Sequence, residues 1–173
     1  MASDFRMHRR LLAAAARLTA GFALVSAGTA QDVGKPASPI YGVTIPDGYR
    51  RWLLIAPASE GEPLNELRVV LGNAVAVEAY TRGTLPFPDG TVLVKLAWKH
   101  VASPEFEAAT VPGMATTVQV MMKDSKRYPA SGGWGFGRFV DGKPADEAEH
   151  RTCFACHEAR VKDRDYVFTR YAR

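Results

Sequence analysis

The clearest alternation of apolar and polar positions along the chain runs from Thr91 to His100. One set of alternate positions holds Val92, Val94, Leu96 and Trp98, and the other holds Leu93, Lys95, Ala97 and Lys99. Successive side chains of a strand point to opposite faces of its sheet. The pattern therefore predicts a strand over residues 91–100, with an apolar face and a face that mixes lysines with small or apolar side chains.

Three shorter segments show the same two-residue period, at 66–71, 116–123 and 133–140, and a brief apolar segment covers 53–57. A helix is predicted over Ala74–Arg82, because Asn73 is a good N-cap and Gly83 a good terminator. A second short helix is predicted from Thr152, as its cap, to about Lys162. It follows a charged loop at 141–150 and precedes an extended aromatic end at 165–171. The fold class is α+β, mainly antiparallel β, with a small sheet, short helices and a C-terminal helix.

The first thirty residues differ from the rest of the chain and are typical of an export signal. A basic start (Arg6 to Arg10) precedes the Ala- and Leu-rich stretch Leu11–Val25, and Gly28-Thr29-Ala30 is an acceptable cleavage site. An uncleaved anchor is the alternative, but about 20 apolar residues are needed to span a bilayer, and Arg17 interrupts this stretch. We expect a signal peptide at 1–30, a flexible lead-in at 31–40, one domain at 41–173, and a periplasmic protein free of the membrane after cleavage.

Charge gives little sign of a polyanionic partner. The chain has 173 residues and a formal net charge of +4, from 22 basic and 18 acidic residues. Four of the basic residues and one acidic residue lie in the first thirty positions, which leaves 18 against 17 in the remainder. A nearly neutral domain without a basic stripe gives no indication of nucleic-acid binding.

Both cysteines of the chain fall in one short motif, Cys153-Phe154-Ala155-Cys156-His157. This is the C-x-x-C-H signature of covalent haem attachment. On a helix, positions i, i+3 and i+4 share a face, so both thiols can reach one porphyrin while the imidazole reaches its iron. Three alternatives remain: a thioredoxin-like redox pair, a zinc site completed by His150, and a structural disulfide. The motif and the export signal together favour a single covalent haem c.

The second axial position of the iron decides what such a haem does. Electron carriers fill it with Met or a second His, and the candidates by residue type are Met114, Met121, Met122, His100 and His150. The histidines border predicted loops and are expected to be exposed, and one of Met121 and Met122 is expected in the core. We expect an open iron site that binds a small molecule.

Several separate blocks, in order along the whole mature domain, make the chain resemble the cytochrome P-460 family, which includes the β-sheet type of cytochrome c-prime. The blocks are Tyr49–Trp52; Tyr80 with Phe87–Lys95; Lys123–Tyr128; Gly133–Phe136; Cys153–His157; and Asp165–Thr169. The resemblance implies a periplasmic, sheet-rich, often dimeric c-haem protein, with a five-coordinate iron and the motif histidine, His157, as its ligand.

The family has two known activities, and the resemblance extends to both. Its enzymes oxidise hydroxylamine and carry a lysine cross-linked to the porphyrin edge, whereas the cytochrome c-prime type lacks the link and binds nitric oxide or carbon monoxide. Lys95 matches the position of the enzymes' lysine, although most lysines lie on solvated faces. The resemblance implies a hydroxylamine-oxidising protein that passes electrons to a partner cytochrome, with a nitric oxide binder and an electron carrier as alternatives.

Catalysis would also need a carboxylate to take protons from a bound amine. Asp146, Glu147 and Glu149 lie just upstream of the haem motif, although a solvated charged segment is the simpler interpretation. Large aromatic side chains could wall the pocket or belong to the core; these are Phe87, Trp134 and Phe136.

Overall fold

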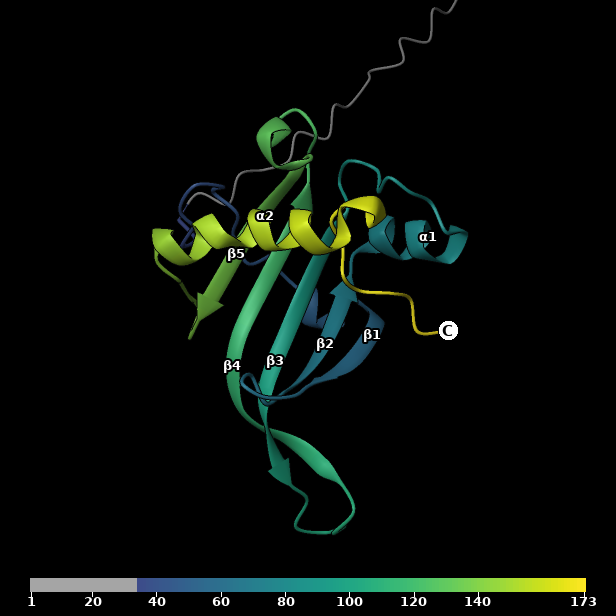
Figure 1. Cartoon of the computed structure of the whole chain (residues 1–173), viewed down its shortest axis with the longest axis vertical. Helices are drawn as coiled ribbons and strands as arrows, with labels where there is room; N and C mark the ends of the chain where they lie inside the picture. The colour runs from purple at the N-terminus through teal and green to yellow at the C-terminus, as the bar shows by residue number, and fades with distance from the viewer. Residues whose placement is uncertain (1–33) are drawn as a thin grey trace, which may run out of the picture. The chain divides into compact units, whose positions relative to one another are not determined.

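The computed structural model describes residues 34–173, which form one six-stranded antiparallel sheet with strands in the order of the chain (Figure 1). The expected signal peptide at 1–30 lies outside the described residues. The strands are β1 (Leu53–Glu60), β2 (Glu66–Gly72), β3 (Val92–Ala102), β4 (Thr110–Lys123), β5 (Trp134–Val140) and β6 (Lys143–Pro144). The helices are α1 (Ala74–Arg82) and α2 (Glu147–Val161), with single 3-10 turns at Tyr49–Arg51, Pro129–Ser131 and Lys162–Arg164. The α+β class predicted from the sequence is confirmed.

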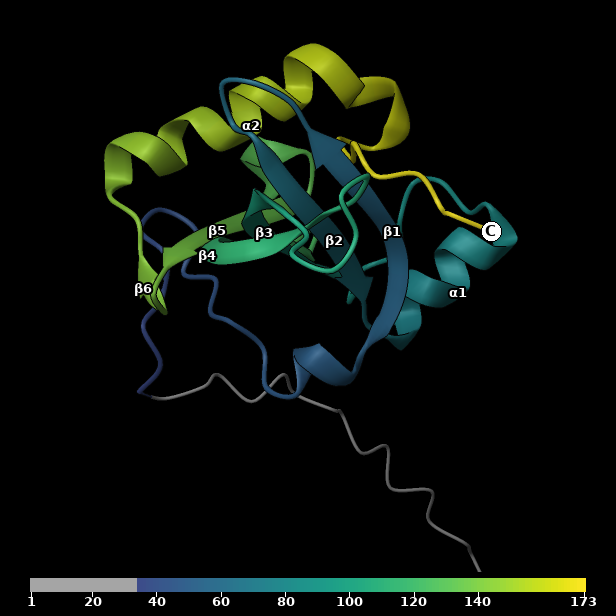
Figure 2. The ribbon, with the colours of Figure 1, turned by 90° about the horizontal axis from the view of Figure 1, so that it is seen from below.

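Both faces of the central part of the sheet are covered, so each face carries buried apolar side chains. Figure 2 shows α2 lying across one face, with the C-terminal tail beside it. The core on that side includes Ile55, Leu93 and Phe136. On the opposite face, Val94 and Val120 pack with Val43 of the segment that precedes β1. The alternation in β3 therefore separates two buried faces.

Strand β3 is the centre of the arrangement and pairs with β2 and β4 along its length. In this register Lys95 lies between Val70 of β2 and Gln119 of β4. Strand β4 begins at Thr110, earlier than the expected 116, because its pairing with β3 continues into a hairpin. The pairing of β3 with β4 shifts register near Trp98, which breaks the two-residue period there. The alternation therefore did not reveal that β4 starts at Thr110.

Strand β1 is longer than the apolar segment expected at residues 53–57. It pairs with β2 alone and lies at the edge of the sheet. An edge position tolerates Pro57, which has no backbone N–H to donate to a second neighbour. The additional residues bring Glu60, at the end of β1, opposite Glu66.

The first helix matches its prediction. The side chain of Asn73 accepts a hydrogen bond from the Ala76 backbone N–H at 3.0 Å, and Gly83 ends the helix in the left-handed conformation with φ of 67°. Asn73 also accepts from the Val92 N–H at 3.1 Å, which ties α1 to the start of β3.

The start of the second helix was predicted wrongly. Helix α2 begins at Glu147, where a charged loop was expected, and its N-cap is Asp146, whose carboxylate accepts from the Glu149 N–H at 2.8 Å. Thr152 lies inside the helix, and its hydroxyl donates to the Glu149 carbonyl. A charged first turn with an acidic cap suits the positive end of a helix, and this signal identifies the start that the apolar pattern missed.

The folded domain includes Ser38, which lies in the segment expected as a lead-in. Its hydroxyl donates to the Phe136 carbonyl at 2.8 Å and accepts from the Val43 N–H at 3.1 Å, and its side chain is buried. Among the residues from 34 onward, no helix is both long enough and apolar enough to cross a membrane.

Candidate functional site

A cavity of about 340 Å³ lies between the sheet, helix α2 and the C-terminal tail. Small-molecule and cofactor sites have volumes of about 300–1,000 Å³. The sheet supplies its floor, with Val70, Leu93, Lys95, Gln119, Met121, Phe136 and Arg138 among the lining residues. Helix α2 supplies Glu149, Thr152, Cys153, Cys156 and His157, and the tail supplies Val167, Phe168 and Thr169.

The three motif residues line this one cavity from a single helix, as their spacing predicts. Both cysteines are free thiols; Cys153 is partly buried and Cys156 is exposed. Burial raises the pKa of the Cys153 thiol above its ordinary value. A buried thiol of raised pKa suits a structural or covalently attached cysteine better than a reactive thiolate.

His157 is held in one orientation. Its Nδ1 donates to the Tyr166 backbone carbonyl at 2.7 Å, so Nε2 is the nitrogen left for a metal. The rings of Phe136 and Phe168 lie edge-to-face with the imidazole, with centroids at 5.0 and 4.8 Å. Burial lowers the pKa of His157, and the hydrogen bond to Tyr166 opposes this in part. A neutral imidazole with one nitrogen bound to a carbonyl is the usual state of a metal-ligating histidine.

Lys95 lies in the floor of the cavity and is paired with a carboxylate. Its Nζ donates to Glu60 Oε2 at 2.8 Å, and the Nε of Arg68 lies 3.1 Å from Glu60 Oε1. The three side chains are between 16% and 23% exposed, and all line the cavity. The sequence analysis identified Lys95 but missed Glu60 and Arg68, because only strand pairing brings residues so far apart in the chain together.

Of the three carboxylates upstream of the motif, Glu149 alone lines the cavity. It forms an ion pair with Arg138 Nε at 2.7 Å across the gap between α2 and β5, and both side chains are partly exposed. Asp146 is the helix cap, and Glu147 pairs with Arg151 on the exposed side of α2.

The aromatic candidates divide between the cavity and the core. Phe136 lines the cavity beside His157. Phe87 and Trp134 are buried against each other with ring centroids at 5.8 Å and do not line it. Their role is therefore in the core.

Among the candidates for a second iron ligand, only Met121 lines the cavity. It pairs in register with Phe136, whose ring contacts His157. Met121 therefore lies on the part of the floor next to Phe136 and is the one candidate that lines the cavity.

The other four candidates lie elsewhere. Met114 is exposed, Met122 packs on the opposite face of the sheet, and His100 contacts Ser59 on the exposed surface. The expectation that His150 is exposed was wrong. It is fully buried; its Nδ1 donates to the Asp146 carbonyl at 2.8 Å and its Nε2 accepts from the Arg138 N–H at 3.0 Å. With both nitrogens engaged, His150 has none free for a metal.

The donor set fits a haem and does not fit the alternatives. Two free thiols and an imidazole with one free nitrogen face a cavity with a largely apolar floor. Within residues 34–173 no group of three His, Cys, Asp or Glu side chains could hold a bare metal ion, and the sheet contains no parallel βαβ unit. Zinc and thioredoxin-like chemistry therefore lack support.

One face of the antiparallel sheet, a thiol pair and an oriented imidazole line the same cavity, an arrangement that suits a haem-binding protein. The family model for cytochrome P460 matches residues 46–169, and the chain belongs to this family. The match covers β1 to the tail, including every cavity residue named above. The chain is therefore a haem-binding cytochrome. A search of curated proteins found no matching relative.

Proposed function

We propose that this chain is an exported protein with one covalent haem c and an open iron site, which oxidises hydroxylamine or a related small nitrogen compound. Cys153 and Cys156 would form the thioether links, and the Nε2 of His157 would bind the iron. The haem, when bound, supplies the redox chemistry, and an acceptor cytochrome would take the electrons.

The observation that supports this activity most directly is the position of Lys95. Its amine lies in the floor of the same cavity as the two thiols and His157. Family enzymes carry a porphyrin-linked lysine at the matching position, and Lys95 lines the cavity in which a porphyrin would lie. A solvated lysine would be on an exposed surface, whereas Lys95 is 16% exposed.

Glu149 supports the same activity as the group that would accept protons. A nitrogen compound loses protons as it is oxidised, and a carboxylate within reach of the substrate can take them. Glu149 lines the cavity four residues before Cys153, and its ion pair with Arg138 fixes its position.

Optical spectroscopy and mass analysis of the purified holoprotein test the proposal. We expect a haem on the Cys153–His157 peptide, a strongly red-shifted ferrous Soret band, and loss of that shift in Lys95→Ala. Lys99→Ala, on the same strand face, is the matched control and should leave the spectrum unchanged. An ordinary five-coordinate c-haem spectrum that Lys95→Ala does not change would refute the enzymatic proposal.

Nitric oxide binding without turnover is the second candidate, and the ion pair between Lys95 and Glu60 favours it. The Lys95 amine lies 2.8 Å from Glu60 Oε2, and this ion pair engages the group that would otherwise attack a porphyrin edge. If the chain is a binder, the holoprotein should take up nitric oxide reversibly and show no hydroxylamine-dependent reduction of an acceptor. A low-spin spectrum would instead support an electron carrier with a second protein ligand.

The export signal predicted at residues 1–30 supports a periplasmic location, where the cysteine motif would acquire its haem. The mass of the mature protein tests this, since cleavage after Ala30 leaves Gln31 as the first residue and keeps Ser38 in the fold. A homodimer remains an expectation from the family resemblance, and sedimentation of the holoprotein would test it.

A further inference from the structure

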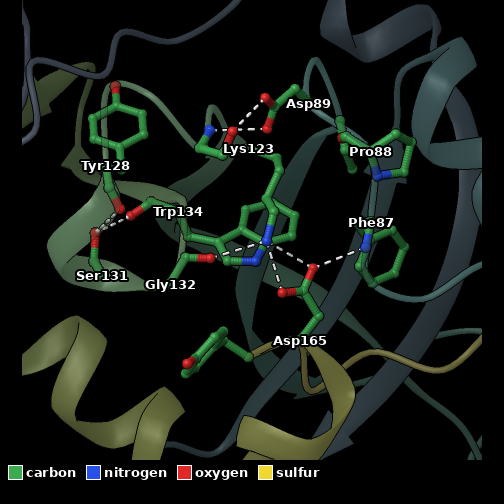
Figure 3. Close-up of polar contacts among 12 residues, drawn as sticks. Phe87, Pro88, Asp89, Lys123, Tyr128, Ser131, Gly132, Trp134 and Asp165 are labelled. Atoms are coloured by element: carbon green, nitrogen blue, oxygen red, sulfur yellow. Dashed lines mark hydrogen bonds and ion pairs between the residues drawn. The ribbon is translucent and has the colours of Figure 1, made fainter.

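A buried ion pair connects the end of β4 to the tail beyond α2, outside the cavity. Lys123 Nζ lies 2.7 Å from Asp165 Oδ1 and 2.9 Å from Oδ2, and the two side chains are 8% and 9% exposed (Figure 3). The proposed chemistry does not use either residue. They lie 42 positions apart in the chain.

The surroundings of the pair satisfy both charges. Lys123 Nζ also donates to the Gly132 carbonyl at 2.9 Å and lies 5.1 Å from the centroid of the Trp134 ring. Asp165 Oδ2 accepts a hydrogen bond from the Phe87 N–H at 2.9 Å. Figure 3 shows Lys123 directed between Gly132, Trp134 and Asp165, with Phe87 on the far side of the carboxylate. Two separate segments, at Phe87 and at Lys123, thus hold one aspartate side chain.

The backbone at this aspartate adopts an unfavourable conformation. Asp165 has φ of 51° and Tyr166 has φ of 64°, two successive non-glycine residues in the left-handed region. L-residues rarely adopt this region, and they remain there only where surrounding contacts hold them. The Asp165 side chain supplies such contacts, and the Tyr166 ring occupies space left by Gly132, where a Cβ atom would come within 2.2 Å of the ring.

The carbonyl of Tyr166, the second residue of this left-handed pair, orients the proposed iron ligand. Tyr166 O accepts the Nδ1–H of His157 at 2.7 Å, so the left-handed pair decides where that acceptor lies. A hydrogen bond at Nδ1 raises the electron density of the imidazole and strengthens its donation to a metal. The contacts therefore run from Lys123 to Asp165, to the Tyr166 carbonyl, and to His157.

We infer that Lys123 and Asp165 are positioning residues for the iron ligand: their ion pair holds the Tyr166 carbonyl against His157 and thereby sets the strength of the axial bond. This inference rests on the proposed function in one respect, that His157 binds the iron. A buried ion pair is a weak source of stability compared with apolar packing, and fixing one backbone geometry gives it a different use.

The iron–histidine stretching band of the ferrous holoprotein, measured by resonance Raman spectroscopy, tests the inference together with the midpoint potential. We expect Asp165→Asn to lower the stretching frequency and to move the potential in the positive direction, because a displaced carbonyl leaves a weaker donor. The double variant Lys123→Met/Asp165→Asn leaves no unpaired buried charge. It should fold where a single variant fails, and it should show the same two shifts.

Asp89→Asn is the matched control. Asp89 contacts Ser125 close to the ion pair but does not touch Asp165 (Figure 3). It should lower stability without moving the band or the potential. A folded double variant with the wild-type band and potential would overturn the positioning role alone. If the wild-type band is missing, or survives in His157→Ala, the ligand assignment fails and the proposed function fails with it.

Discussion

His150 connects the start of α2 to strand β5 through both of its ring nitrogens. Its removal leaves the Arg138 N–H without this partner, whereas the Asp146 carbonyl keeps the bond from the His150 backbone N–H at 3.3 Å. An unsatisfied buried group costs about 1–3 kcal/mol. We therefore expect His150→Leu to lower the free energy of unfolding by about 1–3 kcal/mol, measured by chemical denaturation. The iron spectrum should stay the same, because this histidine has no nitrogen free for a metal.

His100→Leu is the control for that substitution. His100 contacts Ser59 at 3.4 Å on an exposed surface, so its loss should change stability by less than about 0.5 kcal/mol. Equal effects of the two substitutions would contradict the structural role assigned to His150.

Asp89 makes stability depend on pH. Hydrogen bonds from Ser125, to Oδ2 at 2.6 Å and to Oδ1 at 2.8 Å, lower the pKa of Asp89 below its ordinary 3.8. The folded state thus binds this proton more weakly than the unfolded state. The contribution is complete above the ordinary pKa and is lost as pH falls through the lower folded value.

We expect Asp89→Asn to cost about 1 kcal/mol or less at pH 7, since the carboxylate is largely exposed and screened. The difference in unfolding free energy from wild type should shrink as pH falls below the ordinary pKa of 3.8. Chemical denaturation at several pH values measures it. Glu107→Gln, in the loop between β3 and β4, is the control and should stay within about 0.5 kcal/mol of wild type. A difference for Asp89→Asn that persists at the lowest pH would contradict this assignment.

Among single residues, the sequence analysis identified cavity-lining positions where the signal lies between neighbours in the chain. The Cys153–His157 spacing identified three cavity residues. Lys95 came from the family resemblance and from its strand face. Glu60 and Asp165 were missed because their partners lie 35 and 42 positions away. Only strand pairing and the path of the tail bring those charges together, and no local pattern encodes that proximity.

Helix α2 is the element whose boundary determines the geometry of the site. Its cap is Asp146, and Thr152, which was expected to be the cap, lies in its interior. We expect Asp146→Ala to cost about 1 kcal/mol, the usual effect of losing an N-cap. Thr152→Ala should stay within about 0.5 kcal/mol of wild type. Thermal unfolding of the two variants measures the contrast, and a larger loss for Thr152→Ala would contradict the observed start of the helix.

The elements themselves could be predicted where local signals agree. Asn73 and Gly83 gave both ends of α1, and the alternation of β3 gave its two faces. Helix α2 was harder because its first turns are charged, so the start lacked the apolar period that marks an amphipathic helix. The extension of β3 and β4 into a hairpin depends on their pairing, and the register shifts obscure it in the sequence.

For the whole molecule, the tail closes the side of the sheet that carries the cavity. Tyr171 packs on Tyr80 with ring centroids at 6.0 Å, and the Ala172 N–H donates to the Ile55 carbonyl at 2.9 Å. An aromatic pair adds about 0.5–1.5 kcal/mol and a hydrogen bond about 1 kcal/mol. Deleting residues 170–173 should therefore lower stability by about 1–2 kcal/mol in thermal unfolding.

Deletion of Arg173 alone is the control for the shortened chain and should leave the midpoint unchanged. If the two deletions give the same midpoint of thermal unfolding, residues 170–172 contribute nothing to the stability of the fold. The fold class could be predicted from the sequence, but this closure could not, because a terminal segment without a regular period carries no sign of where it packs.

The position of the Tyr166 carbonyl has a consequence for how the chain is made. A ribosome releases the residues of β1 to β5 first, then α2, and then the turn at Asp165 and Tyr166. The acceptor for the His157 proton lies nine positions after the histidine itself. A nascent chain that ends before Tyr166 carries all of the sheet and the complete cysteine motif, yet it has no acceptor for that proton. The oriented imidazole therefore requires a chain that extends at least through Tyr166.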